Sequence, residues 1–319
     1  MTVVVLASLN ADLVVPVDVR PTGGQTVLGG ELVVHCGGKG GNTAAAAALA
    51  GADVRVIGRV GDDEHGRLLR RALIDVGADV TTVVTTPGSA TGVALITVTP
   101  DGENSIVVAP GANGRVGQDD IGDLTGVDVA VVQLEVPLGA VTALARACAA
   151  SGTRFVLNAA PPQSLDPVLL RASDPLVVNT HEAAALTGLA VPADVDDALG
   201  AGAALREQGA KSVVLTMGGG GALVVDATGA WHVAAPHVDA VVDTTGAGDC
   251  LVGTLAARLA AGDDLPTAVA DAVRTATLAV LEPGAQSSYV PRHQALAVPT
   301  DAPRPLRGTV RDAGSSKSP

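Results

Sequence analysis

Short, continuous apolar runs recur along the chain and alternate with longer segments of helical character. Six runs have the β-branched composition of strands buried on both faces: Val3–Ala7, Val54–Ile57, Val129–Val132, Phe155–Leu157, Leu176–Val178 and Val213–Leu215. Four intervening segments favour helices: Thr43–Ala50, Glu64–Asp75, Pro137–Ala150 and Val195–Gln208. This alternation predicts βαβ units and an α/β fold, in which a mostly parallel sheet is flanked by helices.

Two segments interrupt the alternation. Leu13–Val34 carries strand-like residues around a turn at Pro21–Gly24, and Thr91–Val108 has the pattern of a hairpin closed at Asp101 and Gly102. Because neither segment has helical periodicity, we expect a small β lid inserted at about residues 12–35 and 91–110. We expect residues 1–300 to form one α/β domain and residues 301–319, rich in Pro, Arg, Gly and Ser, to form a flexible tail.

Composition narrows the kind of ligand. The chain has 319 residues and is 47% hydrophobic, yet it contains one Phe, one Tyr and one Trp, so its core must consist mainly of Ala, Val and Leu. A site that stacks a base between several aromatic rings is therefore disfavoured. The net charge of −13 argues against a nucleic-acid partner and against an anionic membrane surface, because both attract a basic face.

The cysteines and the N-terminus point to a cytoplasmic protein. Cys36, Cys148 and Cys250 are widely spaced and form no C-x-x-C motif, which argues against a disulfide framework or a zinc site. The N-terminal segment lacks the basic region of a signal peptide, and no apolar run is long enough to span a membrane.

A glycine-rich segment, Asp243–Asp249, precedes an apolar helix predicted at Cys250–Ala260. Small residues at a helix start leave backbone N–H groups uncovered, and these groups and the helix dipole form a site for an anion such as phosphate. Asp249 would repel this anion unless its task is to take a proton from a hydroxyl that attacks the phosphate. The alternative is that Thr244 or Thr245 caps the helix and Asp249 only complements its dipole.

Two further motifs could hold a polyol. Gly37–Asn42 lets a ligand approach the backbone, and we expect Asn42 and Thr43 to begin a helix. Asn10 and Asp12 follow the first strand, and residues two apart in an extended chain point the same way. Taken alone, each motif also fits a purely structural role: a glycine turn with its lysine in solvent, or an Asx turn.

Two strand ends supply candidates for the nucleotide. Asn179 and Glu182 would share a helix face and could hold water around Mg²⁺, although a helix cap made by the same two residues would also explain them. Thr216 leads into Gly218–Gly221, where four glycines permit either the close approach of adenine and ribose or a hairpin turn.

Taken in order, these motifs resemble the ribokinase-like carbohydrate kinase family, along nearly the whole chain to about Pro291. Within the family, the likeness is greatest to the ribokinases. Other segments that carry the resemblance are Thr91–Ile96, Gly102–Asn104, Gln133–Glu135, Asn158–Pro161 and Gly284–Gln286. The resemblance implies a ribokinase-like fold and ATP-dependent transfer of a phosphoryl group to a sugar hydroxyl, O5 in the case of ribose. It also implies Mg²⁺ bound with ATP, a K⁺ activator and a homodimer formed through the lid strands.

The resemblance implies roles at the matching positions. Asp249 would be the base that acts on the acceptor hydroxyl. The anion hole would be formed by the backbone of Gly246, Ala247 and Gly248. The sugar would also be contacted by Asn10, Asp12, Gly38, Lys39, Asn42 and Glu135. The nucleotide would lie along Asn179, Thr216, Gly218, Gly221 and Gly248, with Glu182 holding Mg²⁺ through water. K⁺ would be bound, in part through backbone carbonyls, by Asp243, Thr245, Ala279, Glu282, Gly284 and Ser288.

Three positions depart from the family pattern. Thr180 stands where an acidic residue usually follows Asn179, Thr43 stands where ribokinases commonly have Gln, and Val107–Pro110 differs from the usual lid residues over the sugar. The last two departures leave fructose, a deoxy-ketosugar acid or a nucleoside open as alternatives to ribose. A non-catalytic, sugar- or nucleotide-responsive regulator on the same fold is a further alternative. The intact Gly246–Asp249 segment argues against it.

Overall fold

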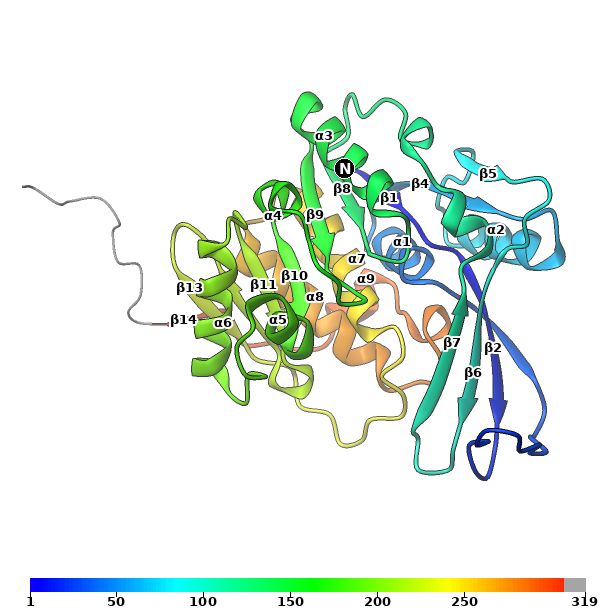
Figure 1. Cartoon of the computed structure of the whole chain (residues 1–319). Coiled ribbons are helices and arrows are strands. Elements are labelled where there is room, and N and C mark those ends of the chain that lie inside the picture. The colour runs from blue at the N-terminus through cyan, green and yellow to red at the C-terminus, as the bar shows by residue number, and fades with distance from the viewer. Residues whose placement is uncertain (307–319) are drawn as a thin grey trace, which may run out of the picture.

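The computed structural model describes residues 1–306, and its centre is a ten-stranded sheet (Figure 1). From β11 to β5 every neighbouring pair of strands is parallel, and an antiparallel edge of three strands follows β11. In spatial order the strands are β14 (Arg304–Pro305), β13 (Ala230–Val233), β12 (Ala222–Val225), β11 (Val213–Thr216), β10 (Leu176–Asn179), β9 (Arg154–Asn158), β8 (Val129–Val132), β1 (Thr2–Leu6), β4 (Asp53–Val60) and β5 (Val83–Thr85). The predicted α/β class is confirmed.

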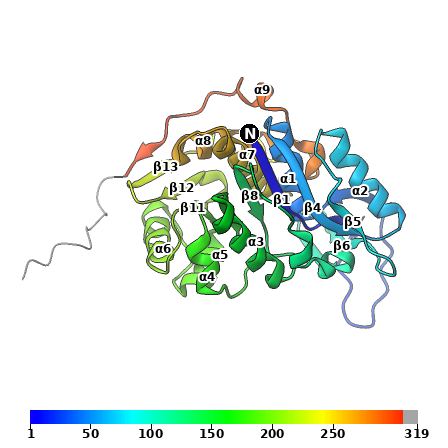
Figure 2. The same cartoon turned by 90° about the horizontal axis from the view of Figure 1, so that it is seen from above.

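Helices cover both faces of this sheet, as the view from above shows (Figure 2). Successive residues of β1 face opposite cores: Val3 and Val5 belong to one apolar cluster, and Val4 and Leu6 belong to the other. This explains why the buried strands are continuously apolar. The first face carries α1 (Lys39–Leu49), α2 (Glu64–Asp75), α7 (Ala247–Ala260) and α8 (Leu265–Ala279). The second carries α3 (Leu138–Ser151), α4 (Pro167–Ala172), α5 (Thr180–Thr187) and α6 (Val195–Glu207).

Small residues let α1 and α7 pack unusually close together. Gly253 of α7 faces the backbone of α1, and a Cβ added there would collide with the Thr43 carbonyl and the Ala46 side chain. The aromatic-poor, alanine-rich composition therefore brings the two helix N-termini next to each other. Both helices begin at the carboxyl edge of the sheet, where open α/β sheets bind ligands.

A second sheet of four strands projects from the main domain beside this edge (Figure 1). Its strands, in spatial order, are β3 (Val33–Gly37), β2 (Asn10–Pro16), β6 (Gly92–Val98) and β7 (Asn104–Ala109). They occupy the two segments that the sequence marked as an inserted lid. The first lid strand begins at Asn10, directly after β1, because β2 pairs along its whole length with β6.

Two expected boundaries differ from the structure. The first helix begins at Lys39 rather than at Asn42 or Thr43, because Gly38, with φ of 83°, turns the chain so that the glycines themselves enter the helix. In the expected tail, Arg304 and Pro305 pair with β13 and the half-buried Leu306 packs against one core. The rest of that tail, residues 307–319, lies outside the described residues. Within residues 1–306, every helix is too short or too polar to cross a lipid bilayer.

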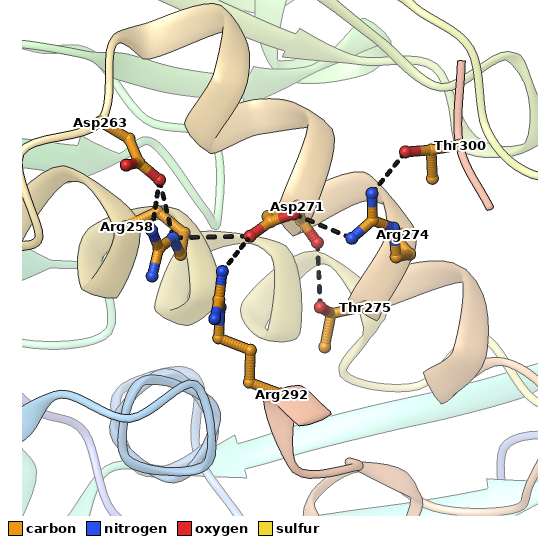
Figure 3. Close-up of polar contacts among 7 residues, drawn as sticks. All are labelled: Arg258, Asp263, Asp271, Arg274, Thr275, Arg292 and Thr300. Atoms are coloured by element: carbon orange, nitrogen blue, oxygen red, sulfur yellow. Dashed lines mark hydrogen bonds and ion pairs between the residues drawn. The ribbon is translucent and has the colours of Figure 1, made fainter. Parts of the chain in front are cut away.

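Three arginines gather around Asp271 on α8 and join α7, α8 and the C-terminal segment (Figure 3). The Asp271 carboxylate accepts hydrogen bonds from Arg274 at 3.0 Å and Arg292 at 3.2 Å, and lies 3.5 Å from Arg258. Its side chain is only 17% exposed. We expect Asp271→Asn to lower the free energy of unfolding by about 2–4 kcal/mol, because it leaves three mostly buried cations with too little negative charge.

Denaturant unfolding measures this loss. Asp75→Asn is the matched control, because Asp75 pairs with Arg71 at 2.8 Å but its side chain is 56% exposed. That substitution should change the free energy by no more than about 0.5 kcal/mol. Equal effects of the two substitutions would contradict a structural role for the arginine cluster.

Candidate active site

The N-terminus of α7 has the geometry of an anion site. Gly246 is its N-cap, with φ of 74°, and the Tyr289 hydroxyl fixes this turn by donating to the Gly246 carbonyl at 2.7 Å. The N–H of Ala247 donates to the Thr244 carbonyl at 3.2 Å, a long hydrogen bond. Among residues 1–306, neither the N–H of Gly246 nor that of Gly248 has such a partner. The alternative, a helix cap by Thr244 or Thr245, is therefore wrong, because α7 has no side-chain cap.

Asp249 lies in the first turn of α7 and is 6% exposed. Its Oδ2 accepts a hydrogen bond of 2.9 Å from Nδ2 of Asn42, and Oδ1 of Asn42 accepts one of 3.1 Å from Gln286. Burial raises the pKa of Asp249 to about 6, although Lys39 and the Asn42 hydrogen bond act to lower it. A carboxylate with this pKa is ionised at neutral pH and is a better proton acceptor than an ordinary aspartate.

Lys39 lies among carboxylates rather than free in solvent. Its pKa is raised most by Asp249, against the lowering effect of burial, and further by Glu135, Glu182 and Asp12. The charge of this half-buried lysine therefore offsets a strongly acidic site. The reading of Gly37–Asn42 as a glycine turn with an exposed lysine is wrong.

Glu135 follows β8 and is held against the start of α1. Its Oε2 accepts hydrogen bonds from Ser8 Oγ at 2.7 Å and from the Lys39 N–H at 3.0 Å, and the Gly40 N–H donates to Ser8 Oγ at 3.1 Å. A carboxylate at a helix N-terminus is stabilised by the helix dipole. Ser8 was not predicted as a site residue, because a serine after a strand carries no signal by itself.

Asn10 and Asp12 both belong to β2 at the base of the lid. Burial and the charges of Glu135 and Asp249 raise the pKa of Asp12 to about 7, although Lys39 acts to lower it. Asp12 lines a cavity under the lid together with the loops at Asp243–Thr245 and Pro283–Ala285. The Asn10 side chain is bonded to Asn113, a buried residue that no sequence motif marked.

On the other side of Asp249, four of the expected nucleotide residues line one cavity: Thr216, Gly218, Gly221 and Gly248. The four glycines form the hairpin turn between β11 and β12, so the hairpin interpretation is correct. Gly218, Gly219 and Gly221 also line this cavity, and the approach of adenine and ribose to them stays a prediction. Most of the remaining wall is apolar and was not predicted: it includes Val241, Leu251, Val273, Ala276 and Val280.

Asn179 and Glu182 form a capping box at the start of α5. The Asn179 side chain accepts from the Glu182 N–H at 2.8 Å, and Glu182 Oε2 accepts from the Asn179 N–H at 2.7 Å. The capping alternative is therefore correct. Burial raises the pKa of Glu182. The charge of Glu182 also acts on Lys39 and Asp249, so its carboxylate lies near the candidate active site.

Asp243 links two loops that the family resemblance assigned to K⁺ binding. Its Oδ1 accepts from the N–H and hydroxyl of Thr245 at 2.9 and 2.6 Å, and its Oδ2 accepts from the Gly284 N–H at 2.8 Å. Ser288 lies in the same C-terminal turn, where its hydroxyl donates to the Ala285 carbonyl. Ala279 is buried at the end of α8, and Glu282 is exposed. No group of three or more His, Cys, Asp or Glu side chains in the described part of the chain could hold a metal.

Comparison with known proteins decides the family. The model of the pfkB family of carbohydrate kinases matches residues 1–292. The chain belongs to this pfkB carbohydrate kinase family. Like its family members, this pfkB kinase catalyses ATP-dependent phosphorylation of a sugar.

Individual relatives of this pfkB kinase are similar along most of their length. A ribokinase of Haemophilus influenzae is 34% identical over 92% of this chain and 97% of its own. A deoxyribokinase of Salmonella typhi is 35% identical over 91% and 95%. A solved structure of Arabidopsis thaliana ribokinase with ribose and ATP superposes with a TM-score of 0.85 at 27% identity, covering 93% of this chain and 97% of that one.

Proposed function

We propose that this kinase phosphorylates D-ribose at O5 to give D-ribose 5-phosphate and ADP. The observation that carries the proposal is the position of Asp249. Its carboxylate interacts electrostatically with Lys39, Glu135 and Asp12, and the neighbouring Gly248, one of the bare amides of α7, lines the largely apolar cavity at Gly218 and Gly221. An acceptor hydroxyl and the terminal phosphate of ATP would meet at this point.

The proposed reaction needs one proton acceptor and one anion site. The sugar oxygen forms a bond to the γ-phosphorus as the bond to the bridging oxygen of ADP breaks, and the hydroxyl proton passes to Asp249. An alcohol is far less acidic than a carboxylic acid, so the proton moves late in the transfer. The N–H groups of Gly246 and Gly248 would stabilise charge on the moving phosphoryl group.

The site contains oxygen donors that could hold both cations. One oxygen of Glu182 is used by the capping box, which leaves the other to bind a water of Mg²⁺, an ion that keeps much of its hydration. For K⁺, the Asp243 contacts hold the Thr245 and Gly284 loops together, so their hydroxyl and carbonyl oxygens would supply a hard donor set. Bound Mg²⁺ would neutralise phosphate charge, and bound K⁺ would order the loop before the anion hole.

Loss of the lysine should affect the sugar more than the nucleotide. We expect Lys39→Ala to raise the KM for the sugar roughly 10- to 100-fold, because it removes a charge-assisted hydrogen-bond donor from a partly buried site. The KM for ATP should change little. Steady-state kinetics with each substrate varied in turn measures both KM values. The matched control is Lys211→Ala, because Lys211 is an exposed lysine at the opposite, amino edge of the sheet. An unchanged sugar KM would reject this role.

Replacing K⁺ with tetramethylammonium should lower kcat. The organic cation is too large to take the place of K⁺ between the Thr245 and Gly284 loops, so the turn before Gly246 would lose its support. Asp243→Ala should abolish the response to K⁺, because that side chain ties the loops together. A rate that is the same in both cations would contradict the K⁺ site.

The lid surface supports a homodimer. Its strands and the residue before β3 expose large apolar side chains that a monomer would leave in water: Leu32, Val33, Leu95, Ile106, Val107 and Val108. We expect these strands to pair across a twofold axis with those of a second copy, since an exposed, apolar sheet is otherwise prone to unspecific association. We also propose that the protein acts in the cytoplasm.

An assay of ADP formation over a panel of acceptors tests the proposed function. The panel includes ribose, 2-deoxyribose, fructose, a deoxy-ketosugar acid and nucleosides. We expect the highest kcat/KM with ribose. The similarity to a deoxyribokinase makes 2-deoxyribose the second candidate. A higher kcat/KM with any other acceptor would reject ribose, and no ADP with any acceptor would favour a non-catalytic regulator.

A further inference from the structure

Asn113 is a buried asparagine at the point where the chain returns from the lid to the main domain. The proposed reaction gives it no role. Asn113 is 1% exposed and belongs to the turn η1 (Gly111–Arg115), which directly follows the last lid strand. Its neighbours across the fold are Leu9 and Asn10, where the chain first passes from β1 into the lid. The Asn113 side chain therefore links two places where the chain passes between the lid and the main domain.

Every polar atom of this side chain is used. Oδ1 accepts from the Leu9 N–H at 2.9 Å, while Nδ2 donates to the Leu9 carbonyl at 3.1 Å and to Asn10 Oδ1 at 2.7 Å. An amide nitrogen has two hydrogens, so the two donated bonds exhaust it. Because the backbone of Leu9 fixes which end of the Asn113 amide is the donor, the orientation of the Asn10 amide is fixed in turn.

This contact decides which end of Asn10 a ligand meets. With Oδ1 of Asn10 committed to Asn113, its Nδ2 is the end left over. That nitrogen has no hydrogen-bond partner among residues 1–306, and it is not one of the fully buried polar atoms. Asn10 and Asp12 are two apart on one strand, so they share the face toward the sugar pocket. Asn10 therefore offers a hydrogen-bond donor beside the carboxylate of Asp12.

Gly92 leaves room for the hydrogen bond between Asn10 and Asn113. Gly92 begins β6 and stands directly opposite Asn10 in the parallel register of β2 and β6. A Cβ at position 92 would fall on Asn10 Oδ1 and Asn113 Nδ2, the two atoms that form the bond. The second lid segment thus enters its sheet at a point where any side chain would separate Asn10 from Asn113.

We propose that Asn113 is a positioning residue that aims the amide NH₂ of Asn10 at an oxygen of the sugar that accepts a hydrogen bond. This inference rests on the proposed sugar kinase function and deepens it. Asn113 acts through Asn10 and touches neither substrate. A sugar that lacks an accepting oxygen at this point loses the contact, so the pair contributes to the choice of acceptor.

A double-mutant cycle tests the proposal. Asn10→Ala and Asn113→Ala should each raise the KM for the sugar about tenfold or more, with the KM for ATP within about twofold of wild type. Because Asn113 acts through Asn10, the double variant should be no worse than Asn10→Ala alone. Gly92→Ala should raise the sugar KM in the same way. Thr153→Val is the control for general destabilisation, because it removes a buried hydrogen bond at the amino edge of the sheet, opposite the candidate active site. It should leave both KM values unchanged.

Multiplying effects in the double variant, or equal losses for sugar and ATP, would overturn the proposal. The wild-type protein gives a second test if the variants do not fold. The chain has only six asparagines, so selective ¹⁵N labelling can resolve their side-chain NH₂ signals. Without sugar, the Asn113 NH₂ should be more strongly protected from hydrogen exchange than the Asn10 NH₂, which has no hydrogen-bond partner among residues 1–306. Added ribose should shift and further protect the Asn10 signal. An Asn10 NH₂ that ribose leaves unaffected would also overturn it.

The role of Asn113 and the proposed function can each be rejected without rejecting the other. A wild-type enzyme that turns over no sugar would reject the function. An unprotected Asn113 NH₂ in the sugar-free protein would reject the inference alone, because the hydrogen bonds to Leu9 and Asn10 need no ligand.

Discussion

Asp249→Asn should lower kcat by about 10²- to 10⁴-fold, the usual contribution of a positioned general base. The amide is nearly the same size as the carboxylate, and its oxygen can still accept the hydrogen bond from Asn42. The fold and the ATP site should therefore persist, with a KM for ATP near that of wild type. What disappears is the acceptor for the hydroxyl proton.

The pH profile separates loss of a base from general damage. Burial raises the pKa of Asp249 to about 6, and only the ionised form can take a proton. In wild type, kcat/KM for the sugar should be high above this value and fall as the pH drops through it. The variant should lack this step. Near wild-type turnover by Asp249→Asn, or an unchanged acid limb, would contradict the base assignment.

Gly246→Ala should have the second largest effect, about 10²- to 10³-fold in kcat, comparable to the loss of an oxyanion-hole donor. Gly246 has φ of 74°, and a Cβ there would come within 2.6 Å of both the Ala285 Cβ and the Tyr289 hydroxyl. The turn must move, and the amides that face the phosphoryl group move with it. Steady-state kinetics and thermal unfolding measure the two consequences.

Gly262→Ala is the matched control for this substitution. Gly262 follows the other end of α7 and also has a positive φ, 92°, but a Cβ there would have no neighbour within 4 Å. The Gly262→Ala variant should be less stable than wild type, because its backbone is strained, but it should have the same kcat. If both substitutions lowered kcat equally, the site would depend on the stability of α7 rather than on the geometry of its N-terminus.

The architecture was largely predictable because parallel strands buried on both faces are continuously apolar. The run Val129–Val132 was placed to the residue, and so was the helix Glu64–Asp75. The start of α1 was misplaced, since glycines are poor helix formers and the contacts that hold them in the helix, such as that of Lys39 N–H with Glu135, are non-local. The edge strand at Arg304 was missed because its pairing is entirely non-local.

The candidate site was predictable where its residues form local motifs and not where they act at a distance. Asp249 is marked by the glycines that precede it, and Asn42 by the glycines before it. Nothing near Asn113 in the sequence indicates that it will meet Leu9, more than a hundred positions away. The apolar residues of α8 that line the cavity at Gly218 and Gly221 are likewise indistinguishable from ordinary core residues in a helical pattern.

The close packing of α1 and α7 explains why the two strongest motifs work as one. Asn42 lies in the first turns of α1 and Asp249 in the first turn of α7, and their 2.9 Å hydrogen bond requires the helices to approach closely. Gly253 and the alanines of α1 permit that approach. The composition that disfavoured aromatic stacking thus also lets the proposed base lie beside Asn42, which we expect to contact the sugar.

A crystal structure with ribose and a non-hydrolysable ATP analogue bound together tests the central claim most directly. We expect the acceptor hydroxyl within hydrogen-bonding distance of the Asp249 carboxylate and the γ-phosphate facing the N–H groups at the start of α7. A complex in which the hydroxyl nearest the γ-phosphate lies beside another side chain, with Asp249 turned away from both ligands, would contradict it.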